Sequence, residues 1–334
     1  MPPAVDVALL SASPTLGWRM ADDAFAALIR DAGASCAVVR VSVGRAAFFK
    51  RHPALTDAVE ALAARHSASR LPPARAVVVS TVTASFFQRL SVPYAVRFDA
   101  PAALNRPGWP GAWQRWIEPR ALARASVLLP WSDEAAVPGK RVIPLGVPIE
   151  RIPPAPMRDI PALAYAGNPH KRGLEVLAAA WAASGLEGRL WVGGITPDAG
   201  RAWLARHGVP DPGIEWVGVV PRAQWLALLG RARLYVNASR FEDHGIAPLE
   251  ALSAGAALVT LPTPGPYPAL RMARELAPSL VSTDLAAALR AGAEVDLTDY
   301  ARRADALLAP HRVDALRRTV AEEVLPALGI HSAA

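Results

Sequence analysis

The sequence predicts an α/β protein made of two Rossmann-like domains. Short apolar and β-branched segments alternate with helical stretches in both halves of the chain, as they do in parallel sheets covered by helices. The length of 334 residues exceeds one typical core and suits two domains of similar size. Between the two series of elements, residues 142–162 are rich in proline and lack periodicity, so we interpret them as the connection.

Each half is expected to contain strands that are separated by helices. In the first half, apolar runs predict strands at residues 5–10, 37–41, 76–80, 94–98, 127–130 and 142–145. Helices are expected there at residues 21–32, 55–64 and 113–123. In the second half, strands are expected at residues 163–167, 190–193, 214–217, 234–238, 257–261 and 280–282. The final stretch, residues 311–328, has helical spacing of its apolar side chains.

Composition indicates a globular chain of the reducing cytoplasm. Hydrophobic residues make up 52% of the sequence and charged residues 19%, without a long block of like charge. Cys36 is the single cysteine, which excludes an intramolecular disulfide and a cysteine-based zinc site. No apolar run is long enough to span a bilayer, and the first ten residues lack the features of a secretory signal.

The positive charge is concentrated in the first half. Residues 1–150 hold 17 Lys and Arg against 11 Asp and Glu, whereas residues 151–334 hold 19 against 18. Such a field suits peripheral contact with an anionic membrane or a phosphate-bearing acceptor. The alternative is an arginine-rich solvated surface that needs no ligand. The basic surface carries no nucleic-acid-binding motif, so we expect no nucleic-acid partner.

The most informative stretch is SRFEDHGIAPLEALSAGAALVT, residues 239–260. It follows an apolar strand, turns at residues 243–245, and then continues as a helix with Pro248 in its first turn. A helix that begins near Ala247 directs the free amides of Gly245, Ile246 and Ala247, and the positive end of its dipole, at a bound anion. A diphosphate suits this position.

Two glutamates flank this helix start. Glu250 lies in the first turn and is suited to accept two hydrogen bonds from a ribose diol, while Glu242 ends the strand and is suited to reach hydroxyls of an attached sugar. The alternative is that Glu250 only favours the helix dipole and that Glu242 is a solvated loop acid.

With this context, the region closely resembles family 4 of the retaining glycosyltransferases, the group 1 enzymes of GT-B architecture. Their signature is a glutamate, seven residues and a second glutamate before a small-residue helix and a glycine, and here it reads EDHGIAPLE followed by ALSAG. His244 stands where the family usually has an aromatic residue. We place His244 in the donor site; the alternative is that it packs with its polar tip exposed.

The resemblance implies two Rossmann-like domains that face each other across a cleft. It assigns residues 1–147 to an acceptor-side domain and residues 148–310 to a domain that binds the nucleotide sugar, while residues 311–334 form a terminal helix that crosses back to the first domain. The segment VIPLGVP resembles the family's connection, with Pro148 where an aspartate is common.

The loop AGNPHKRG after the first strand of the second half supplies two cations, Lys171 and Arg172. Beside amide donors they are suited to neutralise a departing diphosphate, so we assign them catalytic roles together with Glu242. Gly167 precedes them and is placed at the donor. The family usually has an arginine where Asn168 stands, and Lys171 is a candidate for the missing cation. The alternative is a basic loop in water.

Other candidates have weaker signals. Val220 lies in a segment that resembles the one along the nucleotide base, and Gly17 permits close approach of the backbone after the first strand. Arg97 and Asp99 end a first-half strand and are either acceptor contacts or partners in a structural ion pair. Trp109, Trp113 and Trp116, with residues 48–52, are a candidate acceptor rim, but core packing is preferred for Trp113 and Trp116.

The sequence therefore predicts a retaining, metal-independent glycosyltransferase whose donor is a nucleotide-diphosphate sugar and whose acceptor is a glycan, a lipid-linked sugar or a small molecule. No helix carries His and Glu at metal-ligand spacing, and no cofactor is expected besides the donor substrate. The resemblance implies reaction on one face of the sugar without a protein nucleophile. The alternatives are a nucleotide-sugar epimerase or hydrolase of the same fold, and a degenerate, non-catalytic sugar-nucleotide-binding protein.

Overall fold

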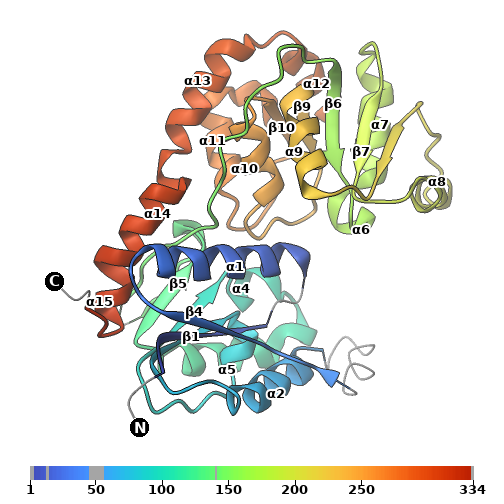
Figure 1. Cartoon of the computed structure of the whole chain (residues 1–334). Coiled ribbons are helices and arrows are strands. Elements are labelled where there is room, and N and C mark those ends of the chain that lie inside the picture. Colours follow the sequence, from blue (N-terminus) through green and yellow to red (C-terminus); the bar gives the residue numbers. More distant parts are fainter. Residues whose placement is uncertain (1–3, 13–14, 45–55, 140, 332–334) are drawn as a thin grey trace. The chain divides into compact units, whose positions relative to one another are not determined.

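The computed structural model describes residues 4–12, 15–44, 56–139 and 141–331, and the chain divides into two compact units (Figure 1). One unit comprises Met1–Pro148 and His311–Ala334, and the other comprises Ile149–Pro310. Within the described residues, no helix combines the length and the apolar character that crossing a membrane requires.

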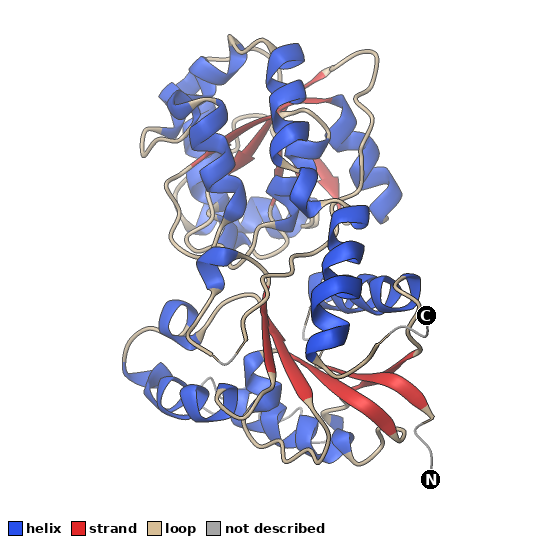
Figure 2. Ribbon diagram, turned by 90° about the vertical axis from the view of Figure 1, so that its left-hand side faces the viewer, coloured by secondary structure: helices blue, strands red, loops and turns tan. Residues whose placement is uncertain are grey.

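The first unit is built on a parallel sheet with the strand order β2-β1-β3-β4-β5, whose strands lie side by side in Figure 2. The strands are β1 (Val5–Ser11), β2 (Cys36–Arg40), β3 (Ala74–Ser80), β4 (Tyr94–Phe98) and β5 (Val127–Pro130). The helices between them are α1 (Leu16–Asp31), α2 (Thr56–Ala68), α3 (Val82–Ser85), α4 (Ala102–Asn105), η2 (Trp109–Gly111), α5 (Ala112–Leu122) and η3 (Asp133–Ala135).

The end of the chain completes the first unit. The segment η5 (Ala309–His311) leads into α14 (Val313–Thr319), the π-helical turn η6 (Val320–Val324) and α15 (Leu325–Ala327). Leu316, Val320 and Val324 share one core with α1 and with the buried face of β1 and β3. The expected return of the terminal helix to the first unit is therefore confirmed, and the opposite face of the sheet packs on α2, α3 and α5.

The second unit has a parallel sheet with the strand order β10-β9-β6-β7-β8. Its strands are β6 (Ile160–Tyr165), β7 (Leu190–Gly193), β8 (Glu215–Gly218), β9 (Ala232–Asn237) and β10 (Ala257–Thr260). Its helices are α6 (Pro169–Arg172), α7 (Leu174–Ser184), α8 (Pro197–Arg206), α9 (Arg222–Arg231), α10 (Ile246–Ser253), α11 (Pro268–Leu276), η4 (Pro278–Leu280), α12 (Leu285–Ala293) and α13 (Leu297–Leu307). This is the doubly wound strand order. From β6 the chain adds β7 and β8 on one side and then β9 and β10 on the other, so the order reverses between β6 and β9.

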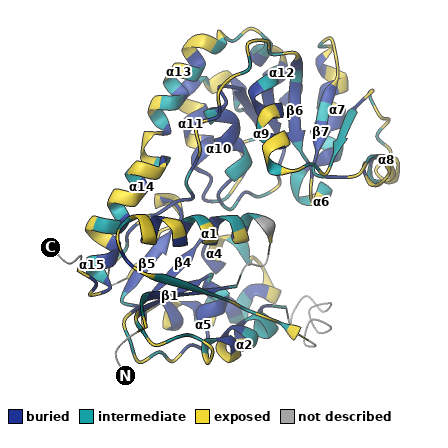
Figure 3. Ribbon diagram, viewed as in Figure 1, coloured by how far each residue is buried: buried dark blue, intermediate teal, exposed yellow. Residues whose placement is uncertain are grey.

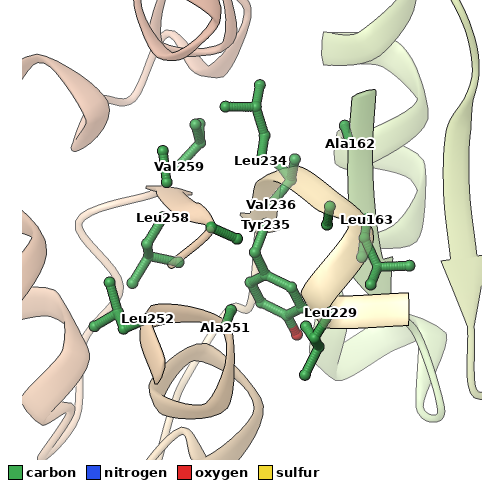
Figure 4. Close-up of a cluster of buried hydrophobic side chains, with 14 of the residues drawn as sticks. Ala162, Leu163, Leu229, Leu234, Tyr235, Val236, Ala251, Leu252, Leu258 and Val259 are labelled. Carbon is green, nitrogen blue, oxygen red and sulfur yellow. The ribbon is translucent and has the colours of Figure 1, made fainter. Parts of the chain in front are cut away.

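Burial is greatest in the central strands and in the edge strands β5 and β10. The central strands are dark blue in Figure 3, whereas the edge strands β2 and β8 are only partly covered. Figure 4 shows the side chains of β9 and β10 in the second core, with Ala251 and Leu252 of α10 and Leu229 of α9 packed against them. The same apolar periodicity that predicts α10 therefore fixes this helix on the sheet.

Two expected strands are not strands of the sheets. Residues 142–145 extend alongside β5 through hydrogen bonds of Ile143 and Leu145, but only one isolated bridge, Val142 with Leu128, forms. Pro130 of β5 lacks the N–H that would bond the carbonyl of Ile143 and complete a second bridge. Residues 280–282 likewise make a single bridge, Val281 with Thr260, after the 3-10 turn η4.

A buried ion pair stabilises the carboxyl ends of the first sheet. Arg97 of β4 and Asp22 of α1 are both 0% exposed and lie 3.1 Å apart. Ser11 and Ser80, at the ends of β1 and β3, donate hydrogen bonds to the same carboxylate. Trp131 stacks its ring 4.7 Å from the guanidinium. Burial lowers the pKa of Arg97 to about 10, and Asp22 opposes this shift, so the arginine stays charged at neutral pH.

The substitution Asp22→Asn should destabilise the protein by about 3 kcal/mol, because it removes the buried, hydrogen-bonded counterion of Arg97 and leaves only the more distant charge of Asp99. The adjacent Asp23 is a matched control on the same helix, since its ion pair with Arg40 is exposed. Asp23→Asn should cost less than about 1 kcal/mol. Urea denaturation followed by circular dichroism measures both, and equal losses for the two variants would contradict the prediction.

Candidate functional site

Three loops meet at the carboxyl edge of the second sheet, where the strand order reverses. They follow β6, β9 and β10, which are neighbours in the sheet. The N–H of Arg240 donates to the carbonyl of Lys171 at 2.9 Å, and the hydroxyl of Thr263 donates to the carbonyl of Ser239 at 2.8 Å. The N–H of Glu242 donates to the carbonyl of Pro264 at 3.1 Å. These bonds link the three loops into one rigid frame at the position where doubly wound sheets bind ligands.

The helix α10 begins at this frame. Gly245 is its N-cap in the left-handed conformation, with φ of +76°, and the N–H of Leu249 is bonded to the carbonyl of Gly245. Pro248 has no N–H, and it occupies a position where a helix would leave that donor unused. The helix therefore begins one residue before Ala247, and the amides of Ile246 and Ala247 lie in its first turn.

Each acidic side chain of the EDHGIAPLE segment is paired with a cation from another part of the second unit. Glu242 accepts a hydrogen bond from Arg172, and Asp243 lies 2.6 Å from Lys171. Glu250 accepts a bond of 2.6 Å from Arg222. The arrangement gathers three carboxylates and three cations around the start of α10, which is suited to hold a polar, anionic ligand.

Burial makes these pairs necessary. The side chains of Glu242 and Glu250 are each 4% exposed, whereas their partners Arg172 and Arg222 are 20% and 35% exposed. Desolvation raises the pKa of Glu250, and Arg222 opposes this rise. Desolvation is the largest single effect and lowers the pKa of Arg172, but the charge and hydrogen bond of Glu242 together with Tyr235 and Tyr165 outweigh it, and the net shift is upward. Arg172 therefore stays charged.

Polar side chains behind the site fix the acidic segment. Ser239 donates to Asn237 at 2.7 Å and also contacts Glu242 at 3.1 Å. The amide of Asn237 donates to the hydroxyl of Tyr267 at 3.0 Å, and Tyr267 closely faces Gly245. A Cβ at Gly245 would lie 2.7 Å from the Tyr267 ring, so the backbone approach requires glycine here.

The predicted donor residues have varied surroundings. Gly167 follows β6 beside the ring of Tyr165. Asn168 caps α6 by accepting a bond of 3.0 Å from the N–H of Lys171, so the residue that departs from the family pattern shapes this loop. His244 is 2% exposed, and Val220 is partly buried on the connection before α9. Gly173 lies between α6 and α7, where it is the C-cap of the first helix and the N-cap of the second.

The acceptor-side candidates Arg97 and Asp99 lie in the first unit. Arg97 is fully buried in an ion pair with Asp22. The alternative expected from the sequence was a structural ion pair, but its partner for Arg97 was Asp99. Asp99 accepts a bond of 3.2 Å from the indole of Trp18. Gly17, which was predicted as a donor-binding residue, also lies in the first unit, in the first turn of α1.

The aromatic rim expected on the first unit is only partly described. Trp113 packs edge-on against Phe86 at 5.7 Å, as expected for a core residue. Trp116 is 63% exposed, so the expectation that it packs in the core is wrong. Its ring instead contacts the guanidinium of Arg120. Trp109 is 88% exposed, and residues 48–52 lie outside the described part of the chain.

Several residues of the site were not predicted from the sequence, namely Arg222, Asp243, Ser239, Asn237 and Tyr267. Only Arg222 had a readable signal. It is the first residue of α9, where the helix dipole disfavours a cation that has no acidic partner. Among the described residues, no group of three or more His, Cys, Asp or Glu side chains is arranged to hold a metal ion.

Comparison with known proteins shows which family and which folds the chain resembles. Residues 160–294 match the model of a family described as Glycosyl transferases group 1. The fold resembles sucrose-phosphate synthase from Thermosynechococcus elongatus, with a TM-score of 0.64 and 15% identity over 93% of this chain and 96% of that one. It equally resembles WaaG, a glycosyltransferase involved in lipopolysaccharide biosynthesis, with a TM-score of 0.64 and 15% identity over 95% and 98% of the two chains.

A glycosyltransferase from Rickettsia africae is similar with a TM-score of 0.58 and 11% identity, over 97% of this chain and 98% of that one. No curated protein matches the sequence closely. The predicted resemblance to group 1 glycosyltransferases is confirmed over the second unit, and the predicted fold class of two parallel α/β units is confirmed for the chain.

The substitution Gly173→Ala should destabilise the frame by about 3 kcal/mol, because the new Cβ would lie 2.4 Å from the carbonyl oxygen of Ala238 and φ is +61°. Gly185 is the control at the other end of α7, since its φ is +67° but no atom lies within 4 Å of an added Cβ. Gly185→Ala should cost only about 1 kcal/mol. Thermal and urea unfolding of both variants compare the two, and losses of the same size would show that the backbone contact is unimportant.

Proposed function

We propose that the protein is a retaining glycosyltransferase that transfers a sugar from a nucleotide-diphosphate donor to a hydroxyl acceptor. One observation carries the proposal: Lys171, Arg172 and the first turn of α10 converge with Glu242 and Glu250 at the switch point of the second sheet. The match of residues 160–294 to group 1 glycosyltransferases supports it.

The donor would lie along the acidic segment. The diphosphate faces Lys171, Arg172 and the amides of Ile246 and Ala247, where opposite charge and helix dipole favour it. Glu250 accepts the ribose hydroxyls, and Glu242 accepts hydroxyls of the transferred sugar. In the resting structure the cations are held by Asp243 and Glu242, so the donor joins an existing charge network.

The chemistry asked of the protein is positioning and charge stabilisation. The acceptor hydroxyl attacks the anomeric carbon on the face from which the diphosphate departs, and the departing phosphate oxygen takes the acceptor proton. The bond between this carbon and the diphosphate oxygen breaks while the new glycosidic bond forms. Lys171 and Arg172 stabilise the charge that develops on the diphosphate, without a metal ion. The acceptor, a glycan, lipid-linked sugar or small molecule, is assigned to the first unit.

The test is to incubate the protein with UDP-, GDP- and ADP-sugars and a panel of hydroxyl acceptors. Acceptor-dependent release of the nucleoside diphosphate, with a product whose anomeric configuration by NMR equals that of the donor, is the expected result. Sugar release without an acceptor would indicate a hydrolase, and an altered sugar on the nucleotide would indicate an epimerase. Binding without any turnover would indicate a non-catalytic protein.

The two glutamates should separate donor recognition into two parts. Glu250→Gln should lower the affinity for the free nucleoside diphosphate and for the nucleotide sugar alike, by about tenfold, because both ligands contain the ribose. Glu242→Gln should abolish transfer yet leave affinity for the free nucleoside diphosphate unchanged. Isothermal titration of both variants with both ligands measures this. An equal loss of affinity for both ligands in Glu242→Gln would contradict the assignment of Glu242 to the sugar.

The cations should affect turnover strongly, and loss of Arg172 should also cost stability, because it leaves Glu242 buried without its cation. Lys171→Ala and Arg172→Ala are each expected to lower kcat by about 100-fold, because their charge matters most as the diphosphate departs. Arg189→Ala is a control, since its pair with Glu215 is exposed. Activity should persist in EDTA, and loss on chelation that magnesium or manganese restores would contradict the metal-independent mechanism.

A further inference from the structure

Arg222 lies between two carboxylates. Its Nη1 donates to Oε1 of Glu250 at 2.6 Å, and its Nη2 donates to Oε1 of Glu150 at 3.0 Å. The Glu250 side chain is 4% exposed, whereas that of Glu150 is 58% exposed. One guanidinium therefore joins a buried acid of the acidic segment to an exposed acid at the start of the second unit.

Helix chemistry does not account for this arginine. Arg222 is the first residue of α9, and the residue before it, Pro221, makes no side-chain cap. A cation at this end opposes the helix dipole and weakens the helix slightly. The position is favourable only through the carboxylates that Arg222 contacts, and Glu250 is the one that lies in the site.

The Glu250 carboxylate has acceptor positions that Arg222 does not use. An ionised carboxylate accepts about four hydrogen bonds. The described side chains that bond it are Arg222 and Trp225, both from α9. Two acceptor positions are thus used, and a ribose diol needs two more. Arg222 and the diol are therefore able to bind the same carboxylate together.

We propose that Arg222 is the positioning residue for ribose recognition: it keeps Glu250 ionised and fixed in the orientation from which it accepts both ribose hydroxyls, and it is shared with the ribose, not displaced by it. This rests on the proposed function, because it concerns the nucleotide of the donor. Arg222 acts through Glu250 and contacts the reacting atoms at no step.

The charges around Glu250 agree with this role. Burial raises the pKa of Glu250, the charge and hydrogen bond of Arg222 lower it, Glu150 raises it and Trp225 lowers it. Buried Tyr235 of β9 also faces the carboxylate. Loss of Arg222 removes the main opposing effect, so the pKa of Glu250 rises further. A raised pKa means that the ionised, bidentate acceptor is lost as the pH falls, and affinity for ribose falls with it.

The experiment measures affinity for UDP, GDP and ADP, for the 2′-deoxy form of the best of these, and for inorganic diphosphate, by titration calorimetry at pH 6 and pH 8. The variants are Arg222→Met, Arg222→Lys, Glu250→Gln and the double variant of Arg222→Met with Glu250→Gln. The control is Arg231→Met, which removes the last arginine of the same helix, whose pair with Asp159 is exposed. Circular dichroism verifies that each variant is folded.

Arg222→Met is expected to weaken the nucleoside diphosphate at least about tenfold at pH 8 and more at pH 6, with inorganic diphosphate unaffected. The 2′-deoxy ligand should lose less than the parent ligand, and the double variant should bind no worse than Glu250→Gln alone. Arg222→Lys should show the pH dependence of the parent protein and recover part of its affinity, because a lysine keeps the charge without the planar fork. Arg231→Met should change nothing.

Other outcomes overturn the proposal. Tighter binding by Arg222→Met would show that Arg222 blocks Glu250 and is displaced by the ribose. Unchanged binding, or equal losses for the 2′-deoxy ligand and for inorganic diphosphate, would show that Arg222 does not act through the ribose. A loss that is independent of pH would overturn the ionisation of Glu250 as its mechanism. If no nucleoside diphosphate binds the parent protein, the proposed function itself fails, and that result is separate from any difference between variants.

Discussion

The candidate site depends on the neutralisation of carboxylates that the fold buries at the start of α10. The side chains of Glu242 and Glu250 are almost fully enclosed, and an enclosed carboxylate is costly unless a cation and hydrogen-bond donors compensate it. The cations come from α6 and α9, so the loops after β6 and before α9 must approach α10 closely. Hydrogen bonds between the loop after β9 and the loops after β6 and β10 hold the acidic segment beside α6.

The first unit meets the same constraint with a different result. There a single carboxylate, Asp22, is enclosed with Arg97, two serine hydroxyls and aromatic rings at the carboxyl ends of β1, β3 and β4. The guanidinium there is 0% exposed, whereas Arg172 and Arg222 of the second unit retain exposed surface. The first network is therefore suited to hold the sheet edge together, and the second is suited to receive a ligand.

Much of the fold could be predicted from the sequence. The strands β4, β5 and β7 have the expected bounds, because each is a short apolar run between breakers. The start of α10 was predicted within one residue from Pro248 and the turn before it. Residues 142–145 and 280–282 were expected as strands, and apolar periodicity could not show that Pro130 and the turn η4 limit them to one bridge each.

The pairing within the site could not be predicted, because its partners are distant in sequence. Lys171 lies 72 residues from Asp243, and Arg172 lies 70 residues from Glu242, so only the adjacency of β6 and β9 in the sheet brings them together. The two glutamates were recognisable because their spacing is local. Their partners Arg172 and Arg222 follow from the fold, which decides which of many arginines reaches a buried acid.

The pairing of each cation with a carboxylate affects how the site binds an anion. A site with uncompensated cations would attract phosphate strongly but would be costly to fold, whereas here each cation already has a carboxylate partner. A diphosphate then gains only the difference between new and existing contacts of Lys171 and Arg172, supplemented by the amides of α10. In the proposed complex, neutral ribose and sugar hydroxyls would donate charge-assisted hydrogen bonds to Glu250 and Glu242 without breaking an ion pair. The arrangement favours recognition of the entire donor over recognition of phosphate alone.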